Sequence, residues 1–254
     1  SYVGGGIFGW YSSEAGANGG EPGYTYNADW VFEPLYERQN IGNNQGVAFA
    51  GDLDGDGFAD LAATAYHSSY NEEGEVFIFR GGPAGLSTTA DWYYQGGSRA
   101  VRAGVQARYA GDLNADGYDD FVVTSRGMND DTDAHYAILV WYGGPDFFAP
   151  EQVTEADADW SYSFPLSSTY TDQFVWVAAP GDITGDGYSD LFWANSNFSN
   201  NISGYLGKTF VHAGGPSGLV SDPERSYEGI RGRSFLGRVA GVIGDVNGNG
   251  CADY

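Results

Sequence analysis

Oxygen-bearing side chains recur at a fixed spacing in four short segments of this chain, residues 52–60, 112–120, 182–190 and 245–253. In each segment they stand at positions one, three, five and nine, and a glycine stands at position six. Ca²⁺ takes about six to eight oxygen ligands at roughly 2.3–2.6 Å and tolerates irregular geometry. The pattern therefore predicts four calcium loops in one chain.

The side chains at these positions and the backbone carbonyl at position seven form the predicted ligand sets. They are Asp52, Asp54, Asp56, Phe58 and Asp60; Asp112, Asn114, Asp116, Tyr118 and Asp120; Asp182, Thr184, Asp186, Tyr188 and Asp190; and Asp245, Asn247, Asn249, Cys251 and Asp253. Without a cation, carboxylates this close would repel one another by about 4 kcal/mol per pair at an effective dielectric near 20. Metal is therefore expected to order the loops.

Two other interpretations of the acidic segments are weaker. An EF-hand needs a bidentate Glu at position twelve, where the first three copies have Ala63, Val123 and Trp193. Surface turns rich in Asp and Gly that bind nothing would account for one such loop. They do not account for four copies in register.

The residues around the loops repeat as well, and they read as short strands. An apolar run follows each of the first three loops, and a second strand then ends in Gly-Gly-Pro. A third strand begins with Ala-Asp-Trp, and a fourth leads into the next loop. Gly-Gly-Pro lies at 81–83, 143–145 and 214–216. The Ala-Asp-Trp motif ends at Trp30, Trp92 and Trp160. The lead-in strands are 46–50, 104–110, 174–178 and 238–242. A four-stranded unit that repeats every 60 to 70 residues is the pattern of a β-propeller blade.

The core motif Gly-Asp-(Leu/Ile/Val)-x-x-(Asp/Asn)-Gly-x-x-Asp begins at Gly51, Gly111, Gly181 and Gly244. It resembles the FG-GAP calcium-loop repeat of integrin α-subunit propellers and their bacterial relatives. The resemblance implies an all-β propeller with bound calcium. It also implies a protein-interaction or adhesion module whose ligand contacts cluster on the face opposite the calcium loops.

We expect one domain over residues 1–254, built as four blades of four antiparallel strands. The segment after the fourth loop lacks a second strand, whereas residues 7–10 match the strand that ends in Gly-Gly-Pro. Joining the two termini would complete the fourth blade and close a ring in a monomer. A fragment of a longer propeller, or an oligomer that completes a larger ring, is the alternative expectation.

Charge and composition limit the partners and the location. The net charge is −23 with only eleven basic residues, so nucleic acid and anionic membranes are poor partners. No apolar run approaches the roughly 20 residues of a membrane span, and the single cysteine excludes an internal disulfide. Weak calcium loops need the millimolar calcium found outside the cytoplasm, which predicts an extracellular, cell-surface or periplasmic protein. Asn197 and Asn201 match the glycosylation pattern, whose use depends on the source.

The few arginines mark a candidate binding face. Arg99, Arg102, Arg231 and Arg233 lie in segments that join the outer strand of one blade to the inner strand of the next. In an antiparallel blade these connections emerge opposite the calcium loops. The predicted partner is a protein or glycan bound there, and the alternative is that each arginine pairs with a nearby acid.

The sequence bears on three classes of function: an enzyme, a lectin and an interaction module. His67, His135 and His212 fall in different repeats with no nucleophile motif beside them, so we expect no enzyme. A lectin-like propeller would stack sugars on Trp and Tyr, but the loops 68–74, 127–134 and 195–207 differ in length, whereas equivalent sugar pockets need equivalent residues. A polysaccharide hydrolase or lyase is the least favoured, because metal coordination already accounts for the clustered acids. A calcium-stabilised interaction module is the preferred prediction.

Overall fold

The structure is a computed structural model, and it describes residues 6–13, 16–17, 28–33, 39, 41–42, 46–66, 68, 72–97, 102–126, 135–165, 175–198 and 204–254. These residues form an all-β fold whose one named helical element is a single 3-10 turn, η3 (Glu155–Asp157). In the described ranges, no helix has the length and apolar character needed to cross a membrane.

Three sheets of four or five strands make up most of the fold, with strand orders β12-β8-β7-β6-β5, β13-β11-β10-β9 and β14-β15-β16-β17. The first contains β5 (Val47–Gly51), β6 (Asp60–Ala65), β7 (Glu75–Phe79), β8 (Trp92–Gln95) and β12 (Gln152–Val153). The second contains β9 (Gln106–Gly111), β10 (Asp120–Arg126), β11 (His135–Trp141) and β13 (Trp160–Pro165). The third contains β14 (Val175–Ala178), β15 (Leu191–Asn195), β16 (Lys208–His212) and β17 (Arg225–Glu228). Apart from β12, successive strands pair antiparallel, which confirms the predicted four-strand unit.

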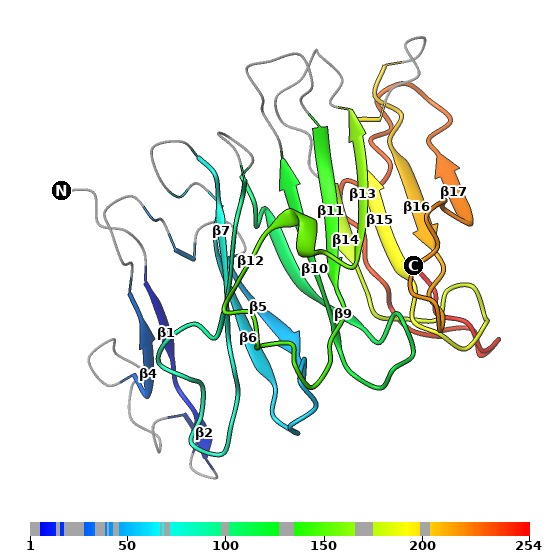
Figure 1. Cartoon of the computed structure of the whole chain (residues 1–254). Coiled ribbons are helices and arrows are strands. Elements are labelled where there is room, and N and C mark those ends of the chain that lie inside the picture. The colour runs from blue at the N-terminus through cyan, green and yellow to red at the C-terminus, as the bar shows by residue number, and fades with distance from the viewer. Residues whose placement is uncertain are drawn as a thin grey trace.

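The sheets stand face to face in a row, as Figure 1 shows. The middle strands β7 and β15 are buried along their whole length, because their sheets are covered on both faces: the first by sheets on either side, the third by the second sheet and by residues 238–254. One apolar cluster, which includes Ile78, Trp92 and Phe121, joins the first sheet to the second. Another, which includes Ile138, Trp160 and Trp193, joins the second to the third. The stacking of sheets on one another thus supplies the core.

A smaller sheet begins the row. It pairs β1 (Ile7–Gly9) with β4 (Trp30–Phe32), and its side chains pack against Phe77 and Phe79 of the first full sheet. A separate two-stranded ribbon of β2 (Ser12–Ser13) and β3 (Gly16–Ala17) follows β1. The sequence predicted that residues 7–10 would instead complete the blade of the fourth calcium loop.

That ring closure is not seen among the described residues. The β1–β4 sheet lies at one end of the row and β17 at the other (Figure 1), and residues 238–254 pack only against the third full sheet, through Ala240, Val242 and Ala252. The expected strand at 238–242 does not form either. The fold is therefore a propeller-like row of blades, and a closed ring of four remains a prediction that small-angle scattering of the chain would test.

The sequence did not predict a strap between the first two full sheets. After β11, residues 142–159 run back over the first sheet, and β12 pairs there in parallel with Tyr93 and Tyr94 of β8. Phe147 stacks on Trp92 with ring centroids 6.0 Å apart and an interplanar angle of 18°. The strap ties the two sheets together at the end where the acidic loops lie.

His212 is a structural residue in this core. Its side chain is fully buried, and its ring packs edge-on against Trp160 and Tyr162, each at 5.0 Å. Nδ1 lies 3.0 Å from the carbonyl oxygen of Val220 and must donate to it, because a carbonyl only accepts. Nε2 is buried and has no hydrogen-bond partner among the described residues. Burial therefore lowers the pKa of His212 below its ordinary value, although Asp222 opposes the shift.

This histidine should make stability depend on pH. The unfolded chain takes up the proton near pH 6.5 while the folded protein resists it, so the free energy of unfolding falls as the pH drops below about 6.5. We expect His212→Phe to lose about 1 kcal/mol at pH 7.5 through the missing hydrogen bond, and to show a shallower decline between about pH 7 and 5. Urea unfolding of both proteins at one calcium concentration measures the difference, in which the loop carboxylates cancel. Parallel pH curves would contradict the assignment.

Candidate metal centre

Each of the first three acidic loops connects the inner strand of a blade to its second strand. Loop 52–60 joins β5 to β6, loop 112–120 joins β9 to β10, and loop 182–190 follows β14 and leads into β15. The inner strands β5, β9 and β14 point the same way in their sheets, so these loops emerge at one end of the sheets (Figure 1). The fold thus gathers the predicted metal ligands on one face.

The side chain at position one closes each loop. Asp52 Oδ2 accepts the N–H of Gly57 at 2.9 Å, and in the other loops Asp112, Asp182 and Asp245 accept from the glycine at position six at 2.8 or 2.9 Å. The side chain at position five likewise accepts the N–H of position seven, at 2.8–3.0 Å in all four loops. This common bonding pattern turns the backbone sharply. It also explains the glycine at position six, whose φ is between +90° and +94° in every copy.

The carboxylate at position nine ties each loop to the rest of its blade. Asp60 accepts the N–H of Leu53 at 3.0 Å through Oδ2 and the N–H of Gly81 at 2.8 Å through Oδ1. Asp120 bonds in the same way to Leu113 and Gly143, and Asp190 to Ile183 and Gly214. The first glycine of Gly-Gly-Pro is therefore part of the loop's support. Both oxygens of Asp60 and Asp120, and Oδ1 of Asp190, keep a further lone pair for a cation, whereas Asp190 Oδ2 also accepts the N–H of Thr184 at 2.8 Å.

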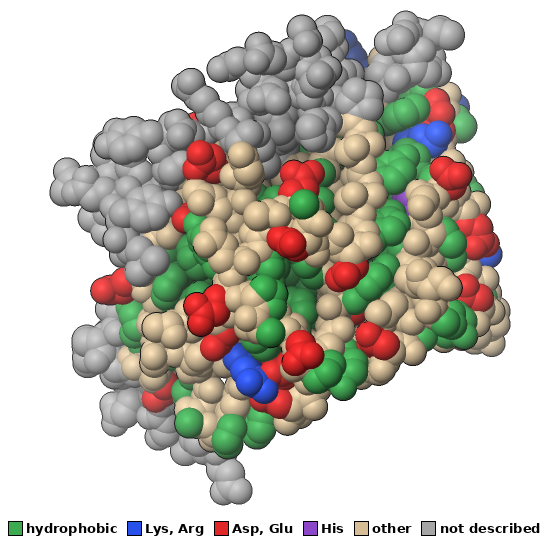
Figure 2. All heavy atoms as spheres, in the orientation of Figure 1, with side chains coloured by type: hydrophobic (Ala, Val, Ile, Leu, Met, Phe, Trp, Pro, Cys, Tyr) green, Lys and Arg blue, Asp and Glu red, His purple; other side chains and the backbone are tan. Residues whose placement is uncertain are grey.

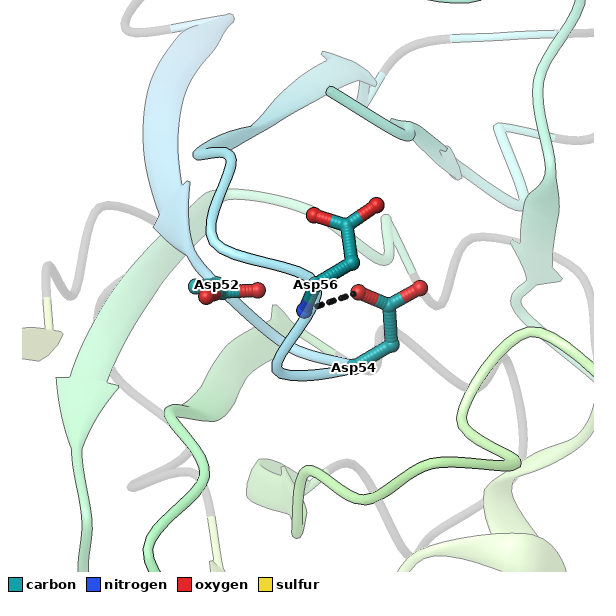
Figure 3. Close-up of side chains that lie close together, drawn as sticks. All are labelled: Asp52, Asp54 and Asp56. Atoms are coloured by element: carbon teal, nitrogen blue, oxygen red, sulfur yellow. Dashed lines mark hydrogen bonds between the residues drawn. The ribbon is translucent and has the colours of Figure 1, made fainter. Parts of the chain in front are cut away.

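Two buried oxygens in the described parts of these loops lack the partner that a cation would supply. Asp52, Asp54 and Asp56 place one carboxylate oxygen each within 4.8 Å of one another, as the close-up in Figure 3 shows. Asp52 Oδ1 is buried and has no hydrogen-bond partner among the described residues, and the same holds for Thr184 Oγ1 at position three of the third loop. Unpaired buried oxygens are costly. The donor set and these orphaned atoms therefore fit a hard cation such as Ca²⁺.

Burial makes the ninth-position carboxylates of the first three loops harder to ionise in the absence of a cation. It raises the pKa of Asp60 to about 6 and that of Asp120 to about 7, against the backbone N–H groups, which lower both. The pKa of Asp190 is raised for the same reason. A bound divalent cation would favour the charged forms, because opposite charge nearby stabilises a carboxylate.

The fourth loop has the same turn but a different setting. At position two, Leu53 and Leu113 of the first two loops are fully buried and Ile183 of the third is 2% exposed. Val246 of the fourth loop is 68% exposed. In the first two loops this residue is covered by a Gly-Gly-Pro turn of the next blade, since Gly144 and Gly215 donate to the carbonyls of Leu53 and Leu113 at 2.8 Å. Among the described residues, no such turn covers Val246.

The backbone at position four of each loop has a positive φ, which the sequence analysis did not predict. Gly55, Gly185 and Gly248 have φ of +73°, +83° and +75°, and the second loop places Ala115 there at +61°. The glycines also admit close neighbours, since an added Cβ would lie 2.5 Å from Tyr118 at Gly55 and 2.7 Å from Cys251 Sγ at Gly185. Glycine at this position in three of the four copies was the available signal.

Neighbouring loops are also joined directly. Asp119 accepts the N–H of Asp52 at 2.8 Å, and Ala252 donates to the carbonyl of Asp182 at 2.6 Å. In both pairs, the residue at position eight of one loop is hydrogen-bonded to the residue at position one of the preceding loop. A change in one loop is therefore expected to reach the next.

The predicted arginine cluster is only partly available for binding. Arg102 donates from Nε to Glu72 Oε2 at 3.0 Å, so it pairs with a nearby acid, as the alternative expectation held. Arg231 and Arg233 are exposed in the connection after β17, at the end of the sheets away from the acidic loops. Arg99 and His67 lie outside the described residues.

The geometry can be set beside known proteins. A family profile described as the FG-GAP repeat matches residues 43–79 and 174–212, which hold the first and third loops. The chain carries FG-GAP repeats. Integrin alpha-5 of Xenopus laevis is 33% identical over 124 residues, a match that covers 42% of this chain and 11% of that protein. This chain therefore spans a small part of the relative it matches, and the likeness is to an integrin-like FG-GAP propeller.

Position four of this FG-GAP chain offers a direct test of the loop geometry. Ala115→Gly should raise the free energy of unfolding by about 1 kcal/mol, since an L residue is strained at positive φ. The matched control is Gly248→Ala at the same position of the fourth loop, where an added Cβ meets nothing within 4 Å. It should destabilise through strain alone. Chemical unfolding measures both, and an Ala115→Gly protein less stable than the parent would contradict the geometry.

Proposed function

We propose that this chain is a calcium-stabilised FG-GAP propeller module that acts outside the cytoplasm by binding a partner, and that it is not an enzyme. Four loops of one sequence pattern fold into one bonding pattern, with an orphaned buried oxygen at position one of the first and at position three of the third. That observation carries the proposal. The predicted sets at positions one, three, five, seven and nine would hold one Ca²⁺ in each loop, which would link the carboxylates and keep the loop closed.

Acidic side chains are spread over the face that Figure 2 presents, and few Lys or Arg side chains appear on it. The charge of −23 disfavours nucleic acid and anionic lipid as partners, and it also makes calcium uptake favourable. Loops of this type are expected to bind weakly, with dissociation constants of about 10⁻⁴–10⁻³ M as in other extracellular modules. The millimolar calcium outside the cytoplasm would fill them.

Removing calcium should therefore lower stability. At free calcium one hundred times the dissociation constant, each independent site adds about 2.7 kcal/mol to the free energy of unfolding. We expect the melting temperature to rise steeply from chelator to millimolar Ca²⁺. In Asp186→Asn the rise should be smaller, because one ligand charge is lost while an oxygen remains for the N–H of Tyr188.

Asp146→Asn is the matched control, because Asp146 is an exposed acid outside the loops. Its melting curves should follow those of the parent with and without calcium. A parent protein whose melting temperature does not respond to calcium would overturn the calcium assignment.

The proposed partner surface is the end of the blades opposite the loops. Arg231 and Arg233 are exposed there on an otherwise acidic protein, which favours a protein ligand that presents carboxylates. In the sequence, the loops 68–74, 127–134 and 195–207 differ in length, which disfavours repeated sugar pockets.

An acidic-peptide array and a glycan array, each probed in calcium, should separate the two classes of ligand. We expect peptide signals that fall in the double variant Arg231→Ser/Arg233→Ser. They should persist in Arg102→Ser, whose arginine is already paired with Glu72. Glycan signals that survive the double variant would favour the lectin instead.

A further inference from the structure

Arg80 places a positive charge inside the first acidic loop. Its guanidinium pairs with Asp54 Oδ2 and lies 3.2 Å from Asp56 Oδ2. These are two of the three carboxylates that converge in this loop. Among the described residues, no other Lys or Arg forms an ion pair with a predicted loop ligand.

The backbone holds Arg80 at this place. Its N–H donates to Asp91 Oδ2 at 2.8 Å, and the N–H of the next residue, Gly81, donates to Asp60 Oδ1 at 2.8 Å. The arginine therefore starts from a fixed point beside position nine of the loop. Its side chain is 44% exposed, while that of Asp54 is 2% exposed, so the guanidinium caps the carboxylate from the solvent side.

The other blades lack this arrangement. The residue before Gly-Gly-Pro is Arg80 in the first blade, Tyr142 in the second and Ala213 in the third. Tyr142 accepts the N–H of Leu219 at 2.8 Å through its hydroxyl, so it is engaged elsewhere. Arg225 does reach the third loop, but it donates to the backbone carbonyls of Ile183 and Thr184 at 3.3 and 3.2 Å.

The extra cation also matches an extra charge. The first loop has four carboxylates at its ligand positions, whereas the second and third have three and the fourth has two. Carboxylate count alone predicts that the first loop binds calcium most tightly. With Arg80 in place, its net charge equals that of the second and third loops.

We propose that Arg80 is a tethered competitor for Ca²⁺ in the first loop, which sets the affinity of that site below the value its carboxylates would give. The inference rests on the proposed calcium function. Without calcium, the guanidinium pairs with Asp54 and Asp56 and keeps the loop closed. Calcium must compete with it, since both positive charges are attracted by the carboxylates of Asp54 and Asp56.

An aromatic ring next to the loop can contact the displaced side chain. The ring of Phe148, in the strap after β11, has its centroid 5.7 Å from Arg80 Cζ. An aromatic face within about 6 Å attracts a guanidinium. The arginine can therefore leave the carboxylates without losing all its favourable contacts, and its movement would report calcium binding to the strap.

Calorimetric calcium titration of the full chain tests the proposal, with Arg80→Met as the variant. Methionine keeps an unbranched apolar stem for Phe148 and removes the charge. We expect one site to bind about tenfold more tightly, as loss of one nearby like charge implies. The melting temperature in chelator should fall, because the carboxylates lose their counter-ion, so the calcium-induced rise should exceed that of the parent.

Arg225→Met is the matched control, because it removes an arginine that touches a loop but not its carboxylates. Its affinities should stay within about twofold of the parent. A second readout is the Nε–Hε NMR signal of Arg80 in arginine-labelled protein, which should shift during the titration and be absent from Arg80→Met.

The possible failures can be told apart. Calcium binding with the same affinities in the parent and Arg80→Met, or an Arg80 signal that calcium does not move, would overturn this inference and leave the calcium function standing. A parent protein that binds no calcium would overturn both. Equal tightening in Arg225→Met would show a general charge effect and would also overturn the specific role of Arg80.

Discussion

The rest of the structure depends on the hydrogen bonds that the buried carboxylate at position nine accepts. In each of the first three repeats it accepts one N–H from position two of its own loop and another from the first glycine of Gly-Gly-Pro, as Asp60 does with Leu53 and Gly81. One side chain thus connects the loop to the end of a distant strand. Burial of a charge is costly unless it is hydrogen-bonded or neutralised, so these bonds and the proposed cation would act together. We therefore expect the proposed metal site and the blade to behave as one cooperative unit.

The contacts between units follow from the same construction. With its glycine held by Asp120 or Asp190, the Gly-Gly-Pro turn of each later blade donates to position two of the preceding loop, at Leu53 or Leu113. Residues at position eight then join adjacent loops, through the side chain of Asp119 to Asp52 and through the backbone N–H of Ala252 to Asp182. Below this edge, apolar side chains from facing sheets fill the space between blades. Calcium loss would therefore weaken both the loops and the contacts between blades, which is why we propose a structural role for the ion.

The two ends of the row show how the apolar surface of a blade depends on a neighbouring sheet. Val246 occupies the position that is buried in the other three loops, yet it is largely exposed, and Val239 and Ile243 nearby are exposed as well. Among the described residues, the β1–β4 sheet packs against the first full sheet and against no other sheet. An apolar surface of this kind is covered in other repeats by the next sheet. The sequence matched these two ends to each other as halves of one blade, a pairing that rests on local pattern and on no long-range contact in this structure.

The sequence alone predicted the four-strand repeat, most of its strands and the positions of the four acidic loops, because side-chain alternation and loop spacing are local properties of the chain. It also indicated that His212 is structural. Only the tertiary structure decided which ends meet, since the order of sheets depends on contacts between residues far apart in the chain. The strap that carries Phe148, the bond from Asp60 to Gly81 and the pairing of Arg80 with Asp54 belong to the same class. Arg80 lies 26 residues from Asp54 and reads locally as the end of a strand. Its position in the loop exists only once the blade has folded and placed the two side by side.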